Sequence, residues 1–467
     1  MATLRAATTL PGDLASLLSA DNGVLAHVRF IDIDTEMKGN VEFDPNSEFG
    51  LVVRLIIGAL TKNCLTGISI GIRIKMSIVL SLLQNQHSLE VLGLRSIIPD
   101  EGAALNMSLA SHGSWITPIL GDIRRLRIPL SVQDPHAYEN SAYLLKSTPN
   151  LRSLCLKGAS KAASLLDDLH EHDVFGGPYT EEAAISTPQL RTLHLLWLEF
   201  RPYPASLFKC INFSNIRILY ITQCRNTEAF LTALVATVPQ ATALRELEIS
   251  LRRKGVPLDR DTRAIEALVS SAPSLVKVWL DVGRGRAVDV SCLSGQSKSL
   301  RQLTLAASSK LQPPAHYTVS DLAKILAQAP DLEKLAVNLC PVSLGPVQYL
   351  AAKFKLPAQA GEEHGELTSY LDRVTLTEEY VHTSQVMMQK FAKEVFRYLA
   401  QHGSKLRTLV VSPDGLDGME RPSFDDDGHR WPRYFYSYGS VWSIRGEHVV
   451  AVPVHMTDVE FCDRATR

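Results

Sequence analysis

A six-residue pattern recurs along the chain: an aliphatic residue, two variable residues, a second aliphatic residue, one variable residue and a third aliphatic residue. Four copies carry leucine at all three aliphatic positions, where about one such copy would be expected by chance. These copies start at Leu89, Leu151, Leu190 and Leu300. Alternation of apolar and variable residues predicts short strands that bury one face and leave the other open to solvent. We therefore expect a sheet built from many similar short strands.

Looser copies of the pattern fill the gaps between the strict ones. They start at Leu25, Leu65, Ile123, Ile216, Leu244, Leu275, Leu332, Leu371 and Leu406, so successive starts lie between 24 and 40 residues apart. Segments with helical periodicity precede several copies, namely 228–238, 262–270 and 319–328. A proline lies between each of these segments and the next copy, where it ends the helix and favours an extended chain. The predicted unit is a helix, a proline turn, a short strand and a loop.

Composition and charge exclude several classes of protein. The 467 residues are 45% hydrophobic and carry a formal net charge of −1, which argues against disorder and against a protein that mainly binds nucleic-acid backbone. No run of about 18 apolar residues occurs, so no membrane span is expected. The seven cysteines are scattered and form no Cys-x-x-Cys pair, which gives no support for a zinc or thioredoxin-type site. Buried free thiols predict a cytoplasmic or nuclear protein.

The pattern resembles leucine-rich repeats. Two copies have cysteine at their ninth position, Cys224 and Cys340, where the repeat consensus has Asn or Cys. Copies that follow Ser-x-Pro-x turns, as at 147–150 and 186–189, resemble the irregular leucine-rich-repeat domains of fungal F-box proteins. The resemblance implies an α/β solenoid of about 13 repeats, with a parallel sheet on its concave face and helices on its convex face. A doubly wound sheet is the alternative, but polar residues at alternate strand positions disfavour it.

The resemblance does not extend to an F-box, the helical module that docks the adaptor subunit of a cullin-type ubiquitin ligase. Leu10–Leu14 echoes the start of that module, but 24 residues before the first copy leave too little room for its helices. We predict a lead-in or capping helix over 1–24 and the solenoid over 25–416. No leucine occurs beyond Leu416 and aromatic residues crowd 431–442, so 417–467 is predicted to be a C-terminal cap.

Residues between the leucines are expected to line the concave sheet, the usual partner-binding surface of a solenoid. Tyr220 and Trp279 are the large aromatic side chains among them, of the kind that dominates binding energy in protein interfaces. The predicted partner-binding residues are Arg29, Arg95, Arg125, Arg127, Lys157, His194, Tyr220, Glu246, Glu248, Lys277, Trp279 and Asp281.

Motifs for chemistry give weaker alternatives. Gly67–Gly71 has the form of a nucleophile elbow around Ser69, but it lies inside a strand copy instead of at a strand-to-helix turn. Cys155 and His194 occupy the same position in consecutive copies, where strands lie about 4.8 Å apart. His170, His172 and Asp173 could bind a metal but are interpreted as part of a solvated loop, as are the acidic segments 362–364 and 425–427. No catalytic residue, metal or cofactor is predicted.

The sequence therefore predicts a non-enzymatic protein-interaction module of the substrate-recognition type. The resemblance implies a link to an SCF-type ubiquitin ligase, with a protein partner on the concave face and the ligase adaptor as a second partner. The alternatives are a scaffold or regulatory repeat protein without a ligase and, third, an enzyme that uses the concave face or the loops. A monomer is expected, with neither nucleic acid nor membrane as partner.

Overall fold

A computed structural model of the chain divides it into two compact units, Met1–Val238 and Pro239–Arg467, which are described separately. The residues that the structure describes are 2–5, 24–33, 48–98, 109–130, 135–158, 189–198, 200, 211–238, 243–251, 259–282, 286–296, 298–306, 317–337, 389, 392–393, 395–401, 406, 408–411, 434–443 and 446–453.

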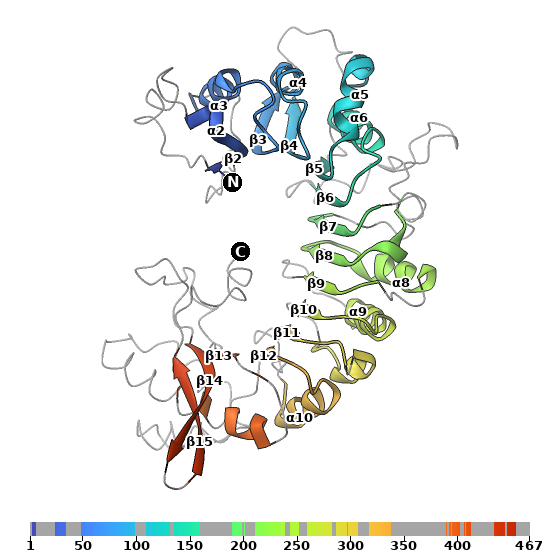
Figure 1. Ribbon diagram of the computed structural model, residues 1–467. Coiled ribbons are helices and arrows are strands. Elements are labelled where there is room, and N and C mark those ends of the chain that lie inside the picture. The colour runs from blue at the N-terminus through green and yellow to red at the C-terminus, as the bar shows by residue number, and fades with distance from the viewer. Residues whose placement is uncertain are drawn as a thin grey trace, which may run out of the picture. The chain divides into compact units, whose positions relative to one another are not determined.

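The first unit contains a parallel sheet whose strands pair in chain order (Figure 1). Its strands are β1 (Ala2–Arg5), β2 (Val28–Ile33), β3 (Gly67–Lys75), β4 (Val91–Ile98), β5 (Arg125–Leu130), β6 (Ser153–Gly158), β7 (Thr192–Leu196) and β8 (Ile218–Thr222). Its helices are α2 (Val24–His27), α3 (Glu48–Ala59), α4 (Met76–Asn85), α5 (Gly113–Gly121), α6 (Pro135–Lys146) and α8 (Thr227–Thr237), with short 3₁₀ turns at Leu109–His112 and Phe213–Asn215. The longer helices lie on one side of the sheet, as Figure 1 shows, so the other side is its open face.

The second unit continues the same plan and then changes direction. Its parallel strands are β9 (Glu246–Ser250), β10 (Lys277–Asp281), β11 (Gln302–Ala306), β12 (Lys334–Val337) and β13 (Thr408–Val411). The antiparallel strands β14 (Tyr434–Ser443) and β15 (Gly446–Pro453) follow β13. The helical elements include α9 (Asp259–Ser271), the 3₁₀ helix η6 (Val290–Gln296) and α10 (Val319–Gln328), and residues 395–401 are also helical.

Strands that alternate with helices and pair in parallel, each with the next in the chain, make an α/β leucine-rich-repeat solenoid, as the sequence predicted. The aliphatic positions of the repeat form the core. Leu154 and Leu156 of β6 pair in register with Leu193 and Leu195 of β7, and all four are buried. Complete burial of one leucine side chain contributes roughly 1.5–3 kcal/mol. The predicted helical segments are also confirmed, because α8, α9 and α10 occupy them.

The cysteine at the ninth position of the repeat connects neighbouring repeats. The Cys224 thiol is buried and donates a hydrogen bond to the carbonyl oxygen of Leu195, at 3.3 Å, in the preceding repeat. This is a structural use of the thiol, and it explains why the repeat consensus accepts a small polar side chain here.

Buried amides hold several turns. The Gln86 side chain is 1% exposed; its Oε1 accepts a hydrogen bond from the Leu65 amide at 3.0 Å and its Nε2 donates to the Thr61 carbonyl at 2.9 Å. In the second unit, the Gln296 amide donates to the carbonyl of Val269, at the end of α9. These side chains satisfy backbone groups that would otherwise be buried without partners.

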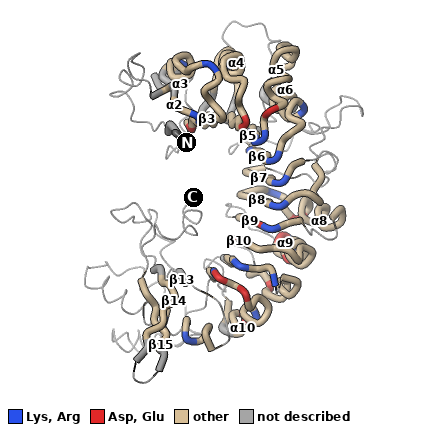
Figure 2. The backbone as a smooth tube through the Cα atoms, viewed as in Figure 1, with Lys and Arg blue, Asp and Glu red and all other residues tan. Residues whose placement is uncertain are grey.

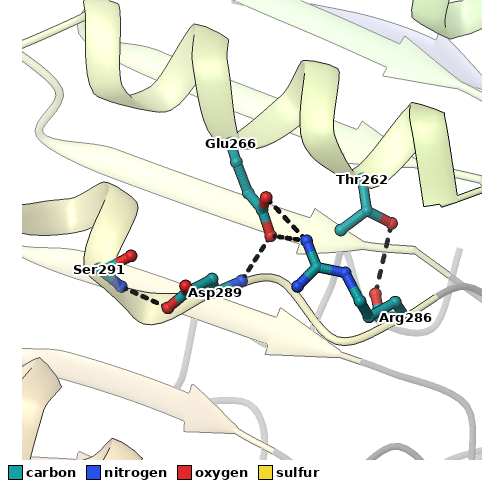
Figure 3. A network of polar contacts seen from close by, with 5 residues as sticks. All are labelled: Thr262, Glu266, Arg286, Asp289 and Ser291. Atoms are coloured by element: carbon teal, nitrogen blue, oxygen red, sulfur yellow. Dashed lines mark hydrogen bonds and ion pairs between the residues drawn. The ribbon is translucent and has the colours of Figure 1, made fainter.

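A polar network ties α9 to the segment before η6 (Figure 3). Arg286 Nη2 lies 2.7 and 2.8 Å from the two carboxylate oxygens of Glu266, and the Asp289 amide donates to the same carboxylate at 2.7 Å. Asp289 in turn accepts a hydrogen bond from the Ser291 amide at 2.9 Å, at the start of η6. Thr262 donates to the Arg286 carbonyl at 3.3 Å. The network fixes the chain between two helical elements.

The first strand copy starts three residues later than predicted. The sequence placed it at Leu25, but α2 covers that residue and β2 begins at Val28. The aliphatic positions are filled by Val28, Ile31 and Ile33, which are 2% exposed or less. Ile31 pairs with Ile68, the second aliphatic residue of the next copy, so inter-strand pairing selects this alignment.

The N-terminal end of the chain differs from the helix that the sequence predicted. Ala2–Arg5 form strand β1, which pairs in parallel with β2, where the sequence predicted a helix over 1–24. Residues 6–23 and the predicted strand copy at Leu371 lie outside the described residues. No helix among the described residues is long and apolar enough to span a membrane.

Candidate partner-binding face

One row of side chains crosses the open face of the first unit. Arg127, Cys155, His194 and Tyr220 occupy the fifth position of four successive repeats and pair in register on β5, β6, β7 and β8. All four side chains are half-buried, whereas the leucine and isoleucine residues on either side of them are buried. The repeat therefore presents one variable side chain per strand at strand spacing, about 4.8 Å.

An aromatic pair lies at the end of this row. The His194 and Tyr220 rings meet edge to face, with centroids 4.4 Å apart and planes inclined by 74°. Aromatic pairs favour this geometry, and it adds about 0.5–1.5 kcal/mol beyond the area buried. The pair fixes two side chains that would otherwise rotate freely on an open face.

A second aromatic contact lies at the C-terminal ends of β6 and β7. The Lys157 ammonium lies 4.4 Å from the centroid of the Trp197 ring, within cation–π range. The Trp197 indole donates a hydrogen bond to Gln223 Oε1 at 2.7 Å. Gly158 allows the backbone of Trp197 to approach, since a Cβ at position 158 would lie 2.3 Å from the Trp197 carbonyl oxygen. Trp197 also adopts a positive φ of 55°, so its position is set by several constraints.

The strands of this face are basic. The repeat segments 123–130, 151–158, 190–198 and 216–225 contain arginine and lysine but neither aspartate nor glutamate. Figure 2 shows the basic residues recurring from β5 to β8. Because the whole chain carries a formal net charge of −1, positive charge is concentrated here. The repeats that contain β5 to β8 are therefore an electrostatically distinct part of the first unit.

The structure brings together five of the residues predicted to bind a partner. Arg125 and Arg127 lie on β5, Lys157 on β6, His194 on β7 and Tyr220 on β8, which are consecutive strands of one unit.

The two predicted arginines nearer the N-terminus are placed differently. Arg29 is exposed, but with β2 starting at Val28 it takes the second position of its repeat, and Phe30 and Asp32 take the open-face positions. Its guanidinium donates to the carbonyl of Cys64 at 3.1 Å. Arg95 lies in β4, and its side chain is outside the described residues.

The second unit gathers the predicted residues in register but does not expose all of them. Glu246 pairs with Lys277, and Glu248 with Trp279, across β9 and β10. Trp279 is 9% exposed and Asp281 is 5% exposed. The sequence predicted that Trp279 and Asp281 would be accessible to a partner, and this is corrected here. Alternation along the strand predicts the side of the sheet on which they lie, but both side chains are buried and interact with other parts of the chain.

The candidate catalytic residues lie in settings that do not activate them. Ser69 lies within β3 between buried Ile68 and Ile70, and not at a sharp turn. Cys155 does pair with His194 across β6 and β7, as predicted. Burial nevertheless raises the pKa of the Cys155 thiol, although the charges of Arg127 and Lys157 act in the opposite direction. A protonated thiol is a poor nucleophile.

The candidate metal ligands His170, His172 and Asp173 lie outside the described residues, as do the acidic segments 362–364 and 425–427. Among the residues that the structure does describe, no group of three or more His, Cys, Asp or Glu side chains could hold a metal ion.

Sequence reasoning missed a row of arginines at the second position of the repeat. We refer to these residues as the arginine ladder: Arg124, Arg152, Arg191 and Arg217. They precede β5, β6, β7 and β8 and are exposed. The signal was present in the sequence, because Leu-Arg or Ile-Arg opens all four copies. It was overlooked because this position lies just before the alternating part of the strand.

Comparisons with known proteins give distant structural matches. No protein-family model matches the chain, and no curated protein matches it. Among solved structures, it resembles a protein of Bacteroides fragilis with 14% identity and a TM-score of 0.32, over 62% of this chain and 68% of that one. It also resembles the leucine-rich-repeat-containing protein LegL7 of Legionella pneumophila, with 14% identity and a TM-score of 0.32, over 76% of this chain and 98% of LegL7.

A further similar structure is TLR13 in complex with ssRNA13, with 12% identity and a TM-score of 0.32. This match covers 67% of the present chain and 36% of TLR13. At these identities and TM-scores, none of the three structures informs the activity or the partner of this chain.

Proposed function

We propose that the chain is a non-catalytic repeat protein that binds a protein partner on the open face of its first unit. The observation that carries the proposal is the row Arg127, Cys155, His194 and Tyr220, which presents half-exposed side chains on four adjacent strands in register. Solenoids use such surfaces to bind partners. Arginine and tyrosine are also the side chains that most often dominate interface energetics.

Site-directed photo-crosslinking tests this assignment. A photo-crosslinking amino acid at Thr192, on the open face of β7, should form a discrete adduct in an extract of cells that express the protein. The matched control is the same amino acid at Ala236, which is exposed on α8 on the helical side. Adducts of equal yield from both positions, or from Ala236 alone, would contradict the assignment.

The predicted residues of the second unit are assigned a secondary role. Glu246, Glu248 and Lys277 are half-exposed on β9 and β10. We propose that they form a charged interaction surface of the second unit by itself, because charged side chains of an interface affect association rate and selectivity more than affinity. Glu246→Gln with Glu248→Gln, which removes two negative charges of β9, should change the salt dependence of partner association with the second unit while leaving adduct formation at Thr192 intact.

Two observations support a non-catalytic role. Ser69 lies in the middle of a strand, and the Cys155 thiol has a raised pKa. The enzyme alternative would be favoured by any hydrolytic activity of the purified chain that is lost in Ser69→Ala or Cys155→Ala.

The finer proposal is that this binding serves a cullin-type ubiquitin ligase. Its support is the resemblance of the repeats to those of fungal F-box proteins. Co-elution of the purified chain with the ligase adaptor subunit in size-exclusion chromatography is the expected result. Separate elution of the two proteins would favour the scaffold or regulatory alternative and leave the partner-binding face unaffected.

We further propose that the chain acts as a monomer in the cytoplasm or nucleus. The described cysteines support a reducing compartment, since Cys64, Cys155, Cys224 and Cys292 are all free thiols. Fluorescence microscopy of a tagged chain and light scattering of the purified protein would test the two parts of this proposal.

The segment 417–467 is proposed to close the end of the repeat array 25–416. Tyr436 of β14 is buried, and the Tyr438 ring packs edge to face against Phe396 with centroids 5.8 Å apart. Gln389 donates a hydrogen bond to the Ala451 carbonyl of β15 at 3.0 Å. Terminal repeats of solenoids need such cover for their core. Tyr436→Ala should therefore lower the free energy of unfolding by about 3 kcal/mol, as for other buried aromatic residues.

A further inference from the structure

The arginine ladder follows the backbone pairing of four successive repeats. The Arg152 amide donates to the Arg124 carbonyl at 2.8 Å, the Arg191 amide to the Arg152 carbonyl at 2.9 Å, and the Arg217 amide to the Arg191 carbonyl at 2.7 Å. The four arginines therefore occupy equivalent positions, one strand apart. At about 4.8 Å per strand, they span roughly 14 Å.

The second unit shows how an arginine at this position is used when it serves the fold. Arg301 Nη1 lies 3.0 Å from Asp331 Oδ2 and also donates to the Asp331 carbonyl at 3.0 Å. Arg245 donates to the Ser274 carbonyl at 3.1 Å. In both cases the guanidinium binds the turn that leads into the next repeat.

The ladder lacks the acidic group that neutralises Arg301. The residue that corresponds to Asp331, immediately before the next repeat, is Asn150, Gln189 or Asn215 in the first unit. Amides at these three positions supply no negative charge to the ladder from the turn that Asp331 occupies in the second unit. Like charges at this spacing repel one another, and an anionic partner would relieve that repulsion.

The side chains of the ladder are available to a partner. Arg124 makes an ion pair of 3.6 Å with Glu90, in which both side chains are half-exposed. Within the part of the chain that the structure describes, no carboxylate pairs with Arg152, Arg191 or Arg217, and all three are exposed. These three arginines therefore do not bind a carboxylate of the following turn as Arg301 does.

We propose that the arginine ladder binds an extended, Asp- and Glu-rich segment of the protein partner. An extended chain advances about 3.4 Å per residue, so roughly four residues match the length of the ladder. Guanidinium groups bind carboxylates through paired hydrogen bonds, which gives orientation as well as charge neutralisation. This inference rests on the proposed function, in which a protein partner binds the open face. The ladder lies beside that face, and the inference adds the chemistry of the partner segment that would bind the ladder.

A single-stranded nucleic acid fits the same region less well. Such ligands need aromatic faces on which bases stack. The Tyr220 ring is already engaged by His194, and the Lys157 ammonium covers one face of Trp197. The sequence pI of about 6.9 is also well below the range typical of nucleic-acid-binding domains.

Fluorescence anisotropy with a labelled octaglutamate peptide tests the inference. The full chain should bind this peptide and not octaglutamine, and the dissociation constant should rise with salt concentration. The triple variant Arg152→Gln, Arg191→Gln and Arg217→Gln should raise the dissociation constant about tenfold or more. Its matched control is Arg260→Gln, Arg263→Gln and Lys298→Gln, which removes three exposed charges of the second unit and should change binding less than threefold.

The possible outcomes separate the hypotheses. Absence of octaglutamate binding, or equal loss in both triple variants, overturns the inference. Tighter binding of oligouridylate of equal charge, lost in the ladder variant alone, overturns it in favour of a nucleic acid.

Ladder-dependent peptide binding without crosslinking at Thr192 supports the ladder and contradicts the assigned face. Crosslinking at Thr192 without peptide binding supports the assigned face and contradicts the role proposed for the ladder. Unchanged thermal unfolding of both triple variants establishes that they are folded.

Discussion

The His194 and Tyr220 rings meet edge to face, with centroids 4.4 Å apart, on neighbouring strands of the first unit. Both residues hold the fifth position of their repeats, so the contact follows from the register of β7 and β8. The pair links the sequence pattern to the proposed partner-binding face. The interaction free energy between the two rings can be measured, and it reports how strongly neighbouring side chains on the open face interact.

We expect a coupling free energy of about 0.5–1.5 kcal/mol between these two rings. Urea unfolding of His194→Ala, Tyr220→Leu and the double variant would give this value as a double-mutant cycle. A coupling indistinguishable from zero would show that the rings do not interact in solution. Thr192 with Ile218, which pair in register on the same two strands, provides a control cycle.

Gln86→Leu should lower the free energy of unfolding by roughly 1–3 kcal/mol. The substitution leaves the Leu65 amide and the Thr61 carbonyl without the side-chain partner that each has now. The matched control is Gln84→Leu, an exposed position near the end of α4, two residues before Gln86, where a change within about 0.5 kcal/mol is expected. Equal effects of the two substitutions would mean that the buried amide does not stabilise the turn.

Gly158→Ala and Gly58→Ala should have effects of opposite sign. A Cβ at 158 would lie 2.3 Å from the backbone oxygen of Trp197, so either β6 or the backbone that follows β7 must move, at a cost of about 1–3 kcal/mol. A Cβ at 58, on the exposed side of α3, meets nothing within 4 Å, and alanine there should stabilise the helix by about 0.5–1 kcal/mol. Differential scanning calorimetry of both variants would show the contrast, and a stabilising Gly158→Ala would contradict the described approach of β6 and Trp197.

Acid should weaken the network before η6. The hydrogen bond from the Ser291 amide is the main cause of a lowered Asp289 pKa in the folded chain. A carboxyl group with a lowered folded pKa contributes stability above its unfolded pKa of about 3.9, and this contribution is lost as the pH falls through the folded value. Asp289→Ala should therefore cost about 1 kcal/mol at pH 7, as loss of a helix-capping residue does, and less at pH 3.

Urea unfolding at the two pH values tests this prediction. Ser294→Ala, at an exposed position within η6, is a suitable control with no expected pH dependence. An Asp289→Ala effect that is the same at pH 3 and pH 7 would contradict the contribution of the ionised carboxylate.

Local pattern predicted the strands where neighbouring copies agree. β6, β7 and β11 begin at Ser153, Thr192 and Gln302, which are the third positions of the strict copies at Leu151, Leu190 and Leu300. Leucine at all three aliphatic positions leaves no other alignment for these segments.

The pattern failed at the first copy because two alignments satisfy it. Leu25, Val28 and Phe30 fit the three aliphatic positions, and so do Val28, Ile31 and Ile33. Pairing with β3 decides between them, and pairing is a non-local property that a six-residue window does not contain.

The burial of residues on the open face also could not be predicted from short sequence segments. Alternation places Trp279 on one side of β10, but residues distant in the sequence determine whether that side is covered. The arginine ladder illustrates the converse. Its recurrence is plain in the sequence, but its geometry becomes visible only when Arg124, Arg152 and Arg191 are seen joined by backbone hydrogen bonds.

The antiparallel hairpin after β13 has a consequence for self-association. A sheet that ended at β13 would present a row of unpaired amide and carbonyl groups, on which a second molecule could add a strand and begin to polymerise. Instead, β14 pairs with β13, and the last strand ends at Pro453, which has no amide hydrogen to donate. The edge of the sheet is thereby moved from β13 to β15, and a proline in an edge strand opposes the addition of a further strand at that position.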